Sequence, residues 1–298
     1  METDNLKDSL GKLKLNIENL NKKSQDYIIN VFKIIKKQIG LKKLTNLTLF
    51  GSQVPQRKDN KSISDCDLLI IVSNDVTKSI MRECEKYISA LEIKHKFREA
   101  NDNLPKKVLF AIQKSTGMFV SHFLTYESHF RKLLFHKMFE VNRVFSLLFA
   151  PRKIVINNVI DNNKTLYGVP INTLIERPKI PTWEILKSLV MNLMISFFSL
   201  LISPFRSLNA IKYQLEAVKW SLRTFNYYVY EDTVILDKII KRYLAHGNNR
   251  KFKQEHRFFN TFLNLRNCIS DDMWFMVRSP IHILKIHRNA TLFRKKFK

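Results

Sequence analysis

One short stretch constrains the fold of this chain more than any other: an apolar strand, a Gly-Ser turn, a polar loop and a second strand that opens with two acids. The first strand is predicted over 44–50 and ends at Gly51-Ser52. After the twelve residues 53–64, the chain continues as Asp65-Cys66-Asp67 and the apolar run 68–72. Successive side chains of a strand point to opposite faces, so Asp65 and Asp67 share one face and their carboxylates converge.

Two ionised carboxylates this close repel each other unless a cation lies between them. Mg²⁺ is the usual solution, bound by carboxylates together with substrate phosphates. A Gly-Ser turn after a strand supplies the other half of such a site, because glycine lets the backbone approach an anion and exposed N–H groups donate to it. The pattern therefore predicts phosphoryl or nucleotidyl transfer. The alternative is a surface loop in which Asp65 is a turn residue and Asp67 is solvated.

At this spacing, the stretch resembles the signature of the DNA polymerase β-like nucleotidyltransferase superfamily, which includes minimal and aminoglycoside-modifying members. The resemblance implies that Gly51 and Ser52 bind a nucleoside triphosphate. It also implies that Asp65 and Asp67 are the catalytic residues and bind Mg²⁺ or Mn²⁺, which activates a hydroxyl for attack on the α-phosphorus. The implied fold class is α+β: a small mixed β-sheet flanked by helices, followed by an all-α helical bundle that closes over the nucleotide or holds the acceptor.

The sequence departs from the family pattern at the third acid, which the family carries on a later strand. The equivalent strand is predicted over 118–125, and it contains Ser121 and His122 but no acid. His122 could be a metal ligand or a base, although an ordinary strand histidine is the simpler interpretation. Three nearby acids could also reach the site: Glu92, Glu99 and Glu127. This departure leaves a catalytically silent fold as an alternative to an enzyme.

The chain is predicted to divide near 178, where Pro170, Pro178 and Pro181 stiffen a linker by fixing φ and restricting the preceding residues. Residues 1–177 are predicted to form the nucleotidyltransferase-like α/β domain, and residues 178–298 the helical bundle domain. A helix is predicted over 24–39 with Ser24 as its N-cap, and a second helix is predicted to follow Asn74 as its N-cap. Further helices are predicted over 127–149, 208–225, 232–245 and 253–269. Further strands are predicted over 92–98, 106–113, 118–125, 152–156 and 164–168.

Charge is the second strong signal. Lys and Arg total 51 against 26 Asp and Glu, and from Lys238 onward 15 basic residues accompany only three acids. Such a field attracts polyanions, so a nucleic acid or another polyanion is a candidate partner. Aromatic residues within the basic runs, at Phe252 and Phe258-Phe259, could stack on unpaired bases. Alternatively, the lysine-rich composition is a general bias and these aromatics belong to the core.

Composition excludes several classes of protein. The three cysteines lie far apart without the spacing of a zinc site or a disulfide scaffold, which is consistent with a cytoplasmic protein. The acidic N-terminus lacks the apolar stretch of a signal peptide. The uncharged segment 188–205 falls slightly short of a membrane span, and we interpret it as a helix at the centre of the bundle. A membrane is therefore not expected as a partner, although spanning and surface association with anionic lipids remain alternatives.

The leading hypothesis is a metal-dependent enzyme that transfers a nucleoside monophosphate from a nucleoside triphosphate to an acceptor, which could be nucleic acid. The alternatives are a silent nucleotidyltransferase fold that binds nucleic acid, and a membrane-associated protein. Arg250 and His256 also fit the loose spacing of helical ribonuclease domains, a match that such a basic chain produces by chance. The sequence leaves open the acceptor, the nucleotide, the third metal ligand or base, and the oligomeric state.

Overall fold

The fold was determined as a computed structural model. It describes residues 15–54, 66–97, 107, 109–110, 112–113, 116–117, 120–205, 208–245 and 252–297. By their contacts the residues form two compact units. Unit 1 contains the chain up to Arg143 together with Asn162–Arg177, and unit 2 contains Val144–Asp161 together with the chain from Pro178. Unit 2 thus includes a segment from the middle of the chain, which a single division near 178 does not anticipate.

Unit 1 is built on a four-stranded mixed sheet with the order β3-β2-β1-β4. The strands are β1 (Leu44–Phe50), β2 (Asp67–Val72), β3 (His122–Tyr126) and β4 (Asn163–Gly168). β1 is antiparallel to both β2 and β4, whereas β2 is parallel to β3. The strands predicted over 44–50 and 164–168 are confirmed, and the one predicted over 118–125 is confirmed at β3.

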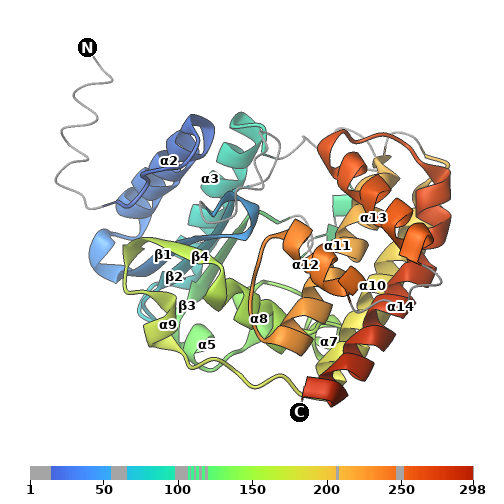
Figure 1. The fold of residues 1–298 in the computed structure, drawn as a ribbon. Coiled ribbons are helices and arrows are strands. Elements are labelled where there is room, and N and C mark those ends of the chain that lie inside the picture. The colour runs from blue at the N-terminus through green and yellow to red at the C-terminus, as the bar shows by residue number, and fades with distance from the viewer. Residues whose placement is uncertain are drawn as a thin grey trace. The chain divides into compact units, whose positions relative to one another are not determined.

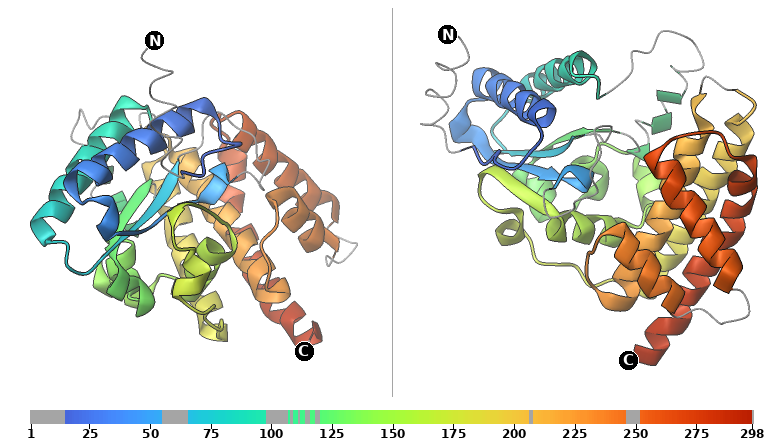
Figure 2. Two further views of the ribbon diagram at one scale, coloured as in Figure 1. Left: turned by 90° about the vertical axis from the view of Figure 1, so that its left-hand side faces the viewer. Right: turned by 45° about the horizontal axis from the view of Figure 1, so that its top comes forward.

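Helices α2 (Lys22–Gln38) and α3 (Lys78–Lys94) lie together on one face of this sheet (Figures 1 and 2). Both helices are amphipathic, with an apolar side toward the sheet and a polar side toward solvent. Their apolar stripes pack on alternate strand residues, and the buried cluster includes Ile28, Phe32 and Ile35 of α2, Cys84 and Ile88 of α3, and Leu47, Leu49, Leu68, Ile70 and Leu124 of the strands. The period of 3.6 residues in the helices and of 2 in the strands therefore produces a single apolar layer.

The caps of these helices differ from those predicted. Asn21, not Ser24, is the N-cap of α2, since its side chain accepts a hydrogen bond from the Ser24 backbone N–H at 2.8 Å. Thr77, not Asn74, caps α3 and accepts from the Ile80 N–H. The side chain of Asn74 accepts instead from the Ser128 N–H at 3.1 Å, a partner 54 positions away that local spacing cannot reveal.

Three predicted strands are wrong. Residues 92–94 continue α3, and the described residues between 107 and 116 are helical, so these described residues form no strand. The third, 152–156, lies in the helix α8 (Arg152–Asp161). Its start is stabilised from a distance, because the Glu184 carboxylate accepts a hydrogen bond from the Lys153 N–H at 2.8 Å and a negative charge favours a helix N-terminus. The predicted helix 127–149 is broken into α5 (Glu127–Arg131), α6 (Phe135–Met138) and α7 (Arg143–Leu148).

The remaining helices are α9 (Ile171–Leu174) in unit 1, and α10 (Thr182–Ile202), α11 (Ala210–Tyr230), α12 (Leu236–Ala245), α13 (Phe252–Asn267) and α14 (Met273–Phe297) in unit 2. Helices α10, α11 and α14 pack on one another along their lengths (Figure 2). The predicted stripe on α11 is confirmed, since Ile211, Leu215, Val218, Leu222 and Phe225 are all buried. The α+β fold class, a small mixed sheet followed by a helical region, is confirmed.

Helix α10 does not have the predicted environment, because only one of its faces is covered. The covered face is mostly polar: Ser188, Asn192, Ser196 and Ser199 are buried, together with Ile185 and Ile195. The opposite face is apolar and exposed, with Leu201 at 75% relative exposure. By length and composition this helix, alone among the described residues, could cross a membrane, and 39% of its most apolar window is buried.

Candidate functional site

The Gly-Ser turn and the second aspartate meet at one end of the sheet. β1 and β2 pair so that Phe50 lies opposite Asp67, which brings the end of one strand beside the start of the next. Gly51 has a φ of +81°, and a Cβ atom added to it would lie 2.1 Å from Asp67 Oδ2. The position therefore requires glycine twice, once for its backbone conformation and once because the carboxylate occupies the space of a side chain. The strand pairing thus brings Gly51 and Asp67 into contact.

A residue that the sequence analysis did not single out also holds the turn. Asn162 lies at the junction of α8 and β4, is buried, and donates through Nδ2 to the Gly51 carbonyl oxygen at 3.0 Å. Next to it, Asn163 pairs with Phe50 across β1 and β4. The only hint in the sequence is the Asn162-Asn163 pair before an apolar strand, which by itself does not distinguish a turn from a site residue.

The other half of the predicted site lies beyond the structural description. Asp65 is outside the described residues, and for Ser52 the structure describes the backbone, in the one-turn helix Gly51–Gln53, but not the side chain. Cys66 and Leu68 belong to the apolar layer beneath α2 and α3, whereas Asp67 does not. Asp67 is partly exposed. By strand alternation it faces away from these helices.

His122 and Glu92 form a buried pair on the helix side of the sheet. His122 Nδ1 lies 2.6 Å from Glu92 Oε1, and both side chains are at most 5% exposed. His122 is in register with Leu68, so it shares the face opposite that of Asp67. The pair packs between strand and helix, which matches the simpler interpretation of His122 as an ordinary strand histidine.

Burial, together with acidic groups on both faces of the sheet, affects a neighbouring tyrosine. Burial first, and then the charges of Glu92, Cys66 and Asp67, raise the pKa of Tyr27 well above its ordinary value. Tyr27 thus stays a neutral phenol within the apolar layer, and its hydroxyl is not a base at neutral pH.

Glu127 is the other described candidate for the third acid, and it lies at the far end of the sheet. It follows Tyr126, which pairs with Val72 at the end of β2 opposite Asp67. A strand of this length separates the two ends by roughly 17 Å. Glu127 accepts hydrogen bonds from Thr45 at 3.0 Å and Arg131 at 2.7 Å, and the bond with Arg131 is the main cause that lowers the Glu127 pKa. Glu99 lies outside the described residues.

On the face of β3 that Asp67 shares, the described side chains are not acidic. By alternation from His122, these are Ser121, Phe123 and Thr125. The ring of Phe123 lies 6.1 Å from that of Phe50 and 5.0 Å from that of Phe139, centroid to centroid. An aromatic cluster therefore lies on the face of β3 where the sequence pattern led us to expect an acid.

The described residues fit a divalent metal only through Asp67. Among them, no group of three or more His, Cys, Asp and Glu side chains is arranged to hold a metal ion. A carboxylate oxygen is the hard donor that Mg²⁺ or Mn²⁺ prefers, and substrate phosphates supply further ligands in such sites. Asp67 meets this requirement, and Asp65 would be the second carboxylate.

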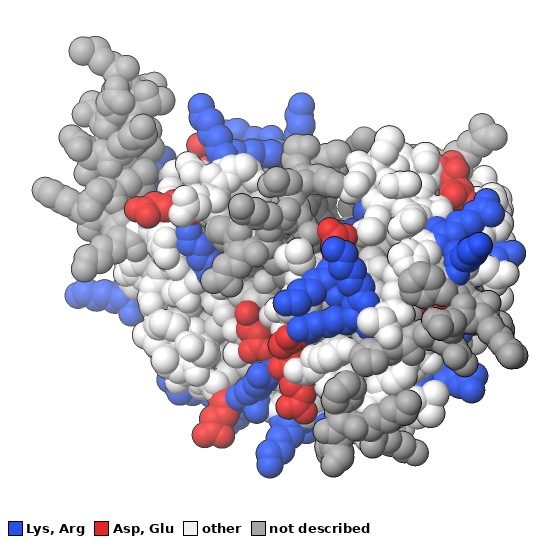
Figure 3. Space-filling model, viewed as in Figure 1, with Lys and Arg blue, Asp and Glu red and all other residues white. Residues whose placement is uncertain are grey.

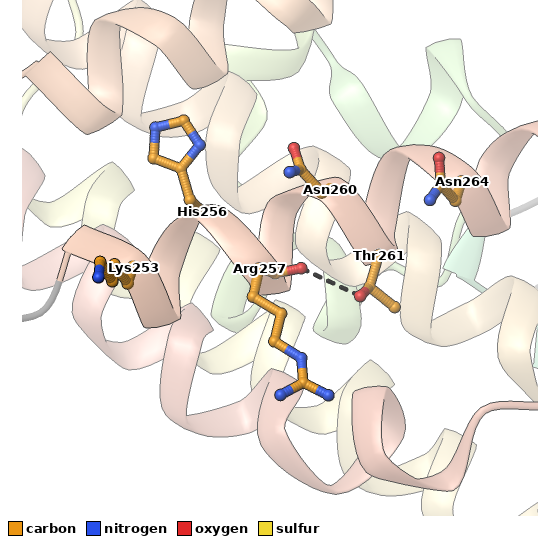
Figure 4. Close-up of a pocket in the computed structure, with 6 residues that line it drawn as sticks. All are labelled: Lys253, His256, Arg257, Asn260, Thr261 and Asn264. Carbon is orange, nitrogen blue, oxygen red and sulfur yellow. Dashed lines mark hydrogen bonds between the residues drawn. The ribbon is translucent and has the colours of Figure 1, made fainter.

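The basic residues of the C-terminal part are distributed over several helices. Figure 3 shows groups of Lys and Arg on the visible face, one of them over α12, with acidic side chains among them. On α13 a shallow hollow is lined by Lys253, His256, Arg257, Asn260, Thr261 and Asn264. Figure 4 shows that these residues follow one another along a single helix, so the hollow is a polar helix face. Arg250, the other member of the ribonuclease-like spacing, lies outside the described residues.

Two of the three aromatics among the basic residues of α13 belong to the core, which is the preferred interpretation of each from the sequence, and do not offer stacking platforms. Phe258 and Phe259 are fully buried, and the Phe258 ring stacks on that of His282 at 3.7 Å between centroids. The spacing of the helix places both side chains on its apolar stripe. For Phe252 the structure describes no side chain.

Comparison with known proteins adds the fold relationship. No family model and no curated protein matches the sequence. Among solved structures, the chain is similar to spectinomycin adenyltransferase AAD(9) from Enterococcus faecialis, whose crystal structure contains ATP and spectinomycin. The similarity has a TM-score of 0.52 at 12% identity, and covers 90% of this chain and 99% of that chain. The chain therefore shares its fold, across nearly its whole length, with an ATP-using adenyltransferase.

Proposed function

We propose that the protein is a nucleotidyltransferase that transfers a nucleoside monophosphate from a nucleoside triphosphate to a hydroxyl group of an acceptor. The contact between Gly51 and Asp67 is the observation that carries this proposal. The fold alone would be insufficient, because one fold hosts many functions. Here, however, two residues of the motif, Gly51 and Asp67, lie against each other, and the fold is shared with an adenyltransferase that was crystallised with ATP.

In this proposal each residue has a defined part. The backbone of Gly51 and Ser52 binds the triphosphate, and Asn162 fixes the orientation of the Gly51 peptide through its hydrogen bond. Asp67, together with Asp65, would hold Mg²⁺ or Mn²⁺, which when bound neutralises phosphate charge and polarises the reacting phosphoryl group. Catalysis of this kind rests on positioning and electrostatics, so a displaced Asp67 carboxylate would slow the reaction even in a folded protein.

The acceptor belongs to one of two classes. The similar AAD(9) structure contains spectinomycin, a small molecule, whereas the net charge of +25 favours a polyanion such as nucleic acid. Both classes offer the hydroxyl group that the reaction needs. The acceptor panel should therefore contain RNA, DNA and small polyhydroxylated amines.

The test measures transfer of label from each α-labelled nucleoside triphosphate to this panel with Mg²⁺ or Mn²⁺. We expect transfer by the unaltered protein and a loss of about 100-fold or more in Asp67→Asn, since the substitution removes the charge and keeps the shape. Asp75→Asn is the matched control, because Asp75 is an exposed aspartate paired with Lys43 near the far end of β2. Absence of transfer under every condition, or equal transfer by Asp67→Asn, would contradict the proposal.

A second candidate is a silent fold that binds nucleic acid. The observation that favours it is the lack of an acid on the described part of β3 that shares the face of Asp67. It predicts binding of RNA or DNA that weakens steeply with salt and is unchanged in a combined Asp65→Asn and Asp67→Asn variant. Metal-dependent triphosphate binding that is lost in this variant would rule the second candidate out.

A further inference from the structure

Most helices in soluble proteins bury apolar side chains and expose polar ones, but α10 buries mainly polar side chains, together with Ile185 and Ile195, and exposes apolar ones. Its buried residues Ser188 and Asn192 are hydrogen-bonded to each other, Ser196 accepts from Gln214 on α11, and Ser199 donates to the Ala210 carbonyl oxygen. Its two charged residues are also buried and partnered. Glu184 caps α8, and Lys187 donates to the Leu147 carbonyl oxygen of α7. The buried polar side chains named here are therefore all partnered within unit 2.

Helix α14 packs against α10 and also exposes apolar residues. Ser188 lies 3.1 Å from His287, and Arg294 donates to the Ile180 carbonyl oxygen, so the two helices run antiparallel. This alignment places Met194 level with Ile281 and Phe197 level with Val277, at the rise of about 1.5 Å per residue. We define the α10–α14 apolar face as Leu186, Met194, Phe197 and Leu201 with Val277 and Ile281, each of which is 45–75% exposed.

This face is larger than the scattered apolar residues of an ordinary surface. A contiguous exposed apolar patch of several half-exposed large side chains marks an interaction site in soluble proteins. Val144 and Leu148 of α7, also more than half exposed, lie close in sequence to Leu147, which Lys187 contacts. All these residues belong to unit 2, so the face is complete within one compact unit.

The charges beside this face indicate what covers it. Arg278 and Arg288 are exposed on α14 among its apolar residues, and Arg278 lies over the Trp274 ring at 4.6 Å from its centroid. Basic and aromatic residues bordering an apolar stripe are typical of helices that lie in the interface of an anionic membrane. A second copy of the chain would bring two molecules of charge +25 together, which repulsion opposes.

Spanning the membrane fits the structure less well than lying on it. The polar face of α10 is held by α11, which carries Lys212, Glu216, Lys219 and Arg223. Moving α10 into the bilayer as a span would either break this packing or carry these charges into hydrocarbon. Docking the exposed face alone preserves every contact described above.

We propose that the α10–α14 apolar face binds the surface of an anionic lipid membrane. The inference is independent of the proposed enzymatic function, since its residues lie outside the Gly51 and Asp67 site. It reverses the expectation from the sequence that a membrane is not a partner. The reason is that the sequence predicted a helix covered on all sides, whereas the structure leaves one side exposed.

The experiment is co-sedimentation of the full chain with vesicles of phosphatidylcholine alone and of phosphatidylcholine mixed with phosphatidylglycerol. We expect binding to the anionic vesicles. A Phe197→Ser, Leu201→Ser variant should need about tenfold more lipid for half-binding, because two half-exposed apolar side chains are lost. The control is Tyr87→Ser, Ile93→Ser on α3, where both residues are 46% exposed; it should bind as the unaltered chain does.

Absence of binding to anionic vesicles, or an equal loss in the control variant, would overturn the proposal. So would a dimer in sedimentation velocity that Phe197→Ser, Leu201→Ser dissociates, because the occupant would then be a second copy. If circular dichroism shows that the double variant is unfolded, Leu201→Ser alone decides the matter, since its side chain is 75% exposed. Unchanged vesicle binding by a folded Leu201→Ser would then contradict the proposal.

Discussion

Helices α2 and α10 show how two regions of one chain use opposite patterns. α2 buries Tyr27, Ile28, Val31 and Phe32 against the sheet and turns its lysines to solvent. α10 buries serines and an asparagine and leaves leucines, a methionine and phenylalanines outside. The comparison shows that an apolar stripe identifies the face of a helix that avoids water. It does not show whether other residues of the same chain pack on that face.

The sheet of unit 1 should be the region most sensitive to loss of apolar volume. Ile70→Ala should lower the free energy of unfolding by about 2–5 kcal/mol, because Ile70 is fully buried in the layer between β2 and the helices. Urea unfolding followed by circular dichroism measures the change. A cost below about 1 kcal/mol would mean that this layer relaxes around the cavity, and the contrast with α10 would be weaker than the structure indicates.

Unit 2 should make stability depend on pH, because burial lowers the pKa of two of its histidines. Burial lowers the pKa of His287 to about 4, and burial is also the main cause that lowers that of His282 to about 4. The unfolded chain binds these protons near pH 6.5, so stability is fully present above that pH and falls as the pH drops toward 4. We expect a loss of about 2 to 3 kcal/mol for each histidine across this window.

Urea unfolding across this pH range, with His287→Gln, checks the assignment. The variant should show a smaller loss of stability between pH 6.5 and 4 than the unaltered chain. His256→Gln, on the polar face of α13, is the control and should leave the slope unchanged. If the free energy of unfolding of His287→Gln depends on pH as steeply as that of the unaltered protein, His287 is not the cause of the loss.

The site can be compared with a second turn in unit 1. Gly40 has a φ of +84°, and a Cβ atom added there would meet nothing within 4 Å, whereas Gly51 has nearly the same φ, +81°, but abuts Asp67. Alanine at either position meets the backbone strain, of about 1–3 kcal/mol. Only Gly51→Ala also displaces the carboxylate, so it should cost more stability than Gly40→Ala and should lose transfer activity. If the two variants have equal stability and equal activity, the contact between Gly51 and Asp67 does not contribute to function.

The smallest expected effect lies on the exposed face of α10. Leu201→Ser should change the free energy of unfolding of the isolated protein by no more than about 0.5 kcal/mol, since the side chain is largely in water in the folded state. Thermal or urea unfolding without lipid measures it. A cost approaching that of Ile70→Ala would show that Leu201 is covered within the protein, and α2 and α10 would then follow the same rule.

Part of this molecule could be predicted from sequence because its determinants are local. The turn at Gly51, the strands 44–50 and 164–168 and the stripe from Ile211 to Phe225 follow from glycine chemistry and from periods of 2 and 3.6 residues. Asp67, which opens the second strand, could be recognised for the same reason. Of the strands wrongly predicted, 92–98 alternates polar and apolar residues and 152–156 ends in three apolar residues. Patterns this short do not separate strand from helix.

Only the tertiary structure determined which residues far apart in the chain come into contact. Strand pairing placed the Asp67 carboxylate where a side chain of residue 51 would lie, and brought Asn162 to the Gly51 carbonyl across 111 positions. Packing buried His122 against Glu92, which assigned that histidine to the interior. It also turned the serines of α10 inward, because their partners lie on α11 and α14. The sequence by itself determined which residues can carry the chemistry and which avoid water; long-range packing determined which of them meet, since that depends on contacts that no local pattern contains.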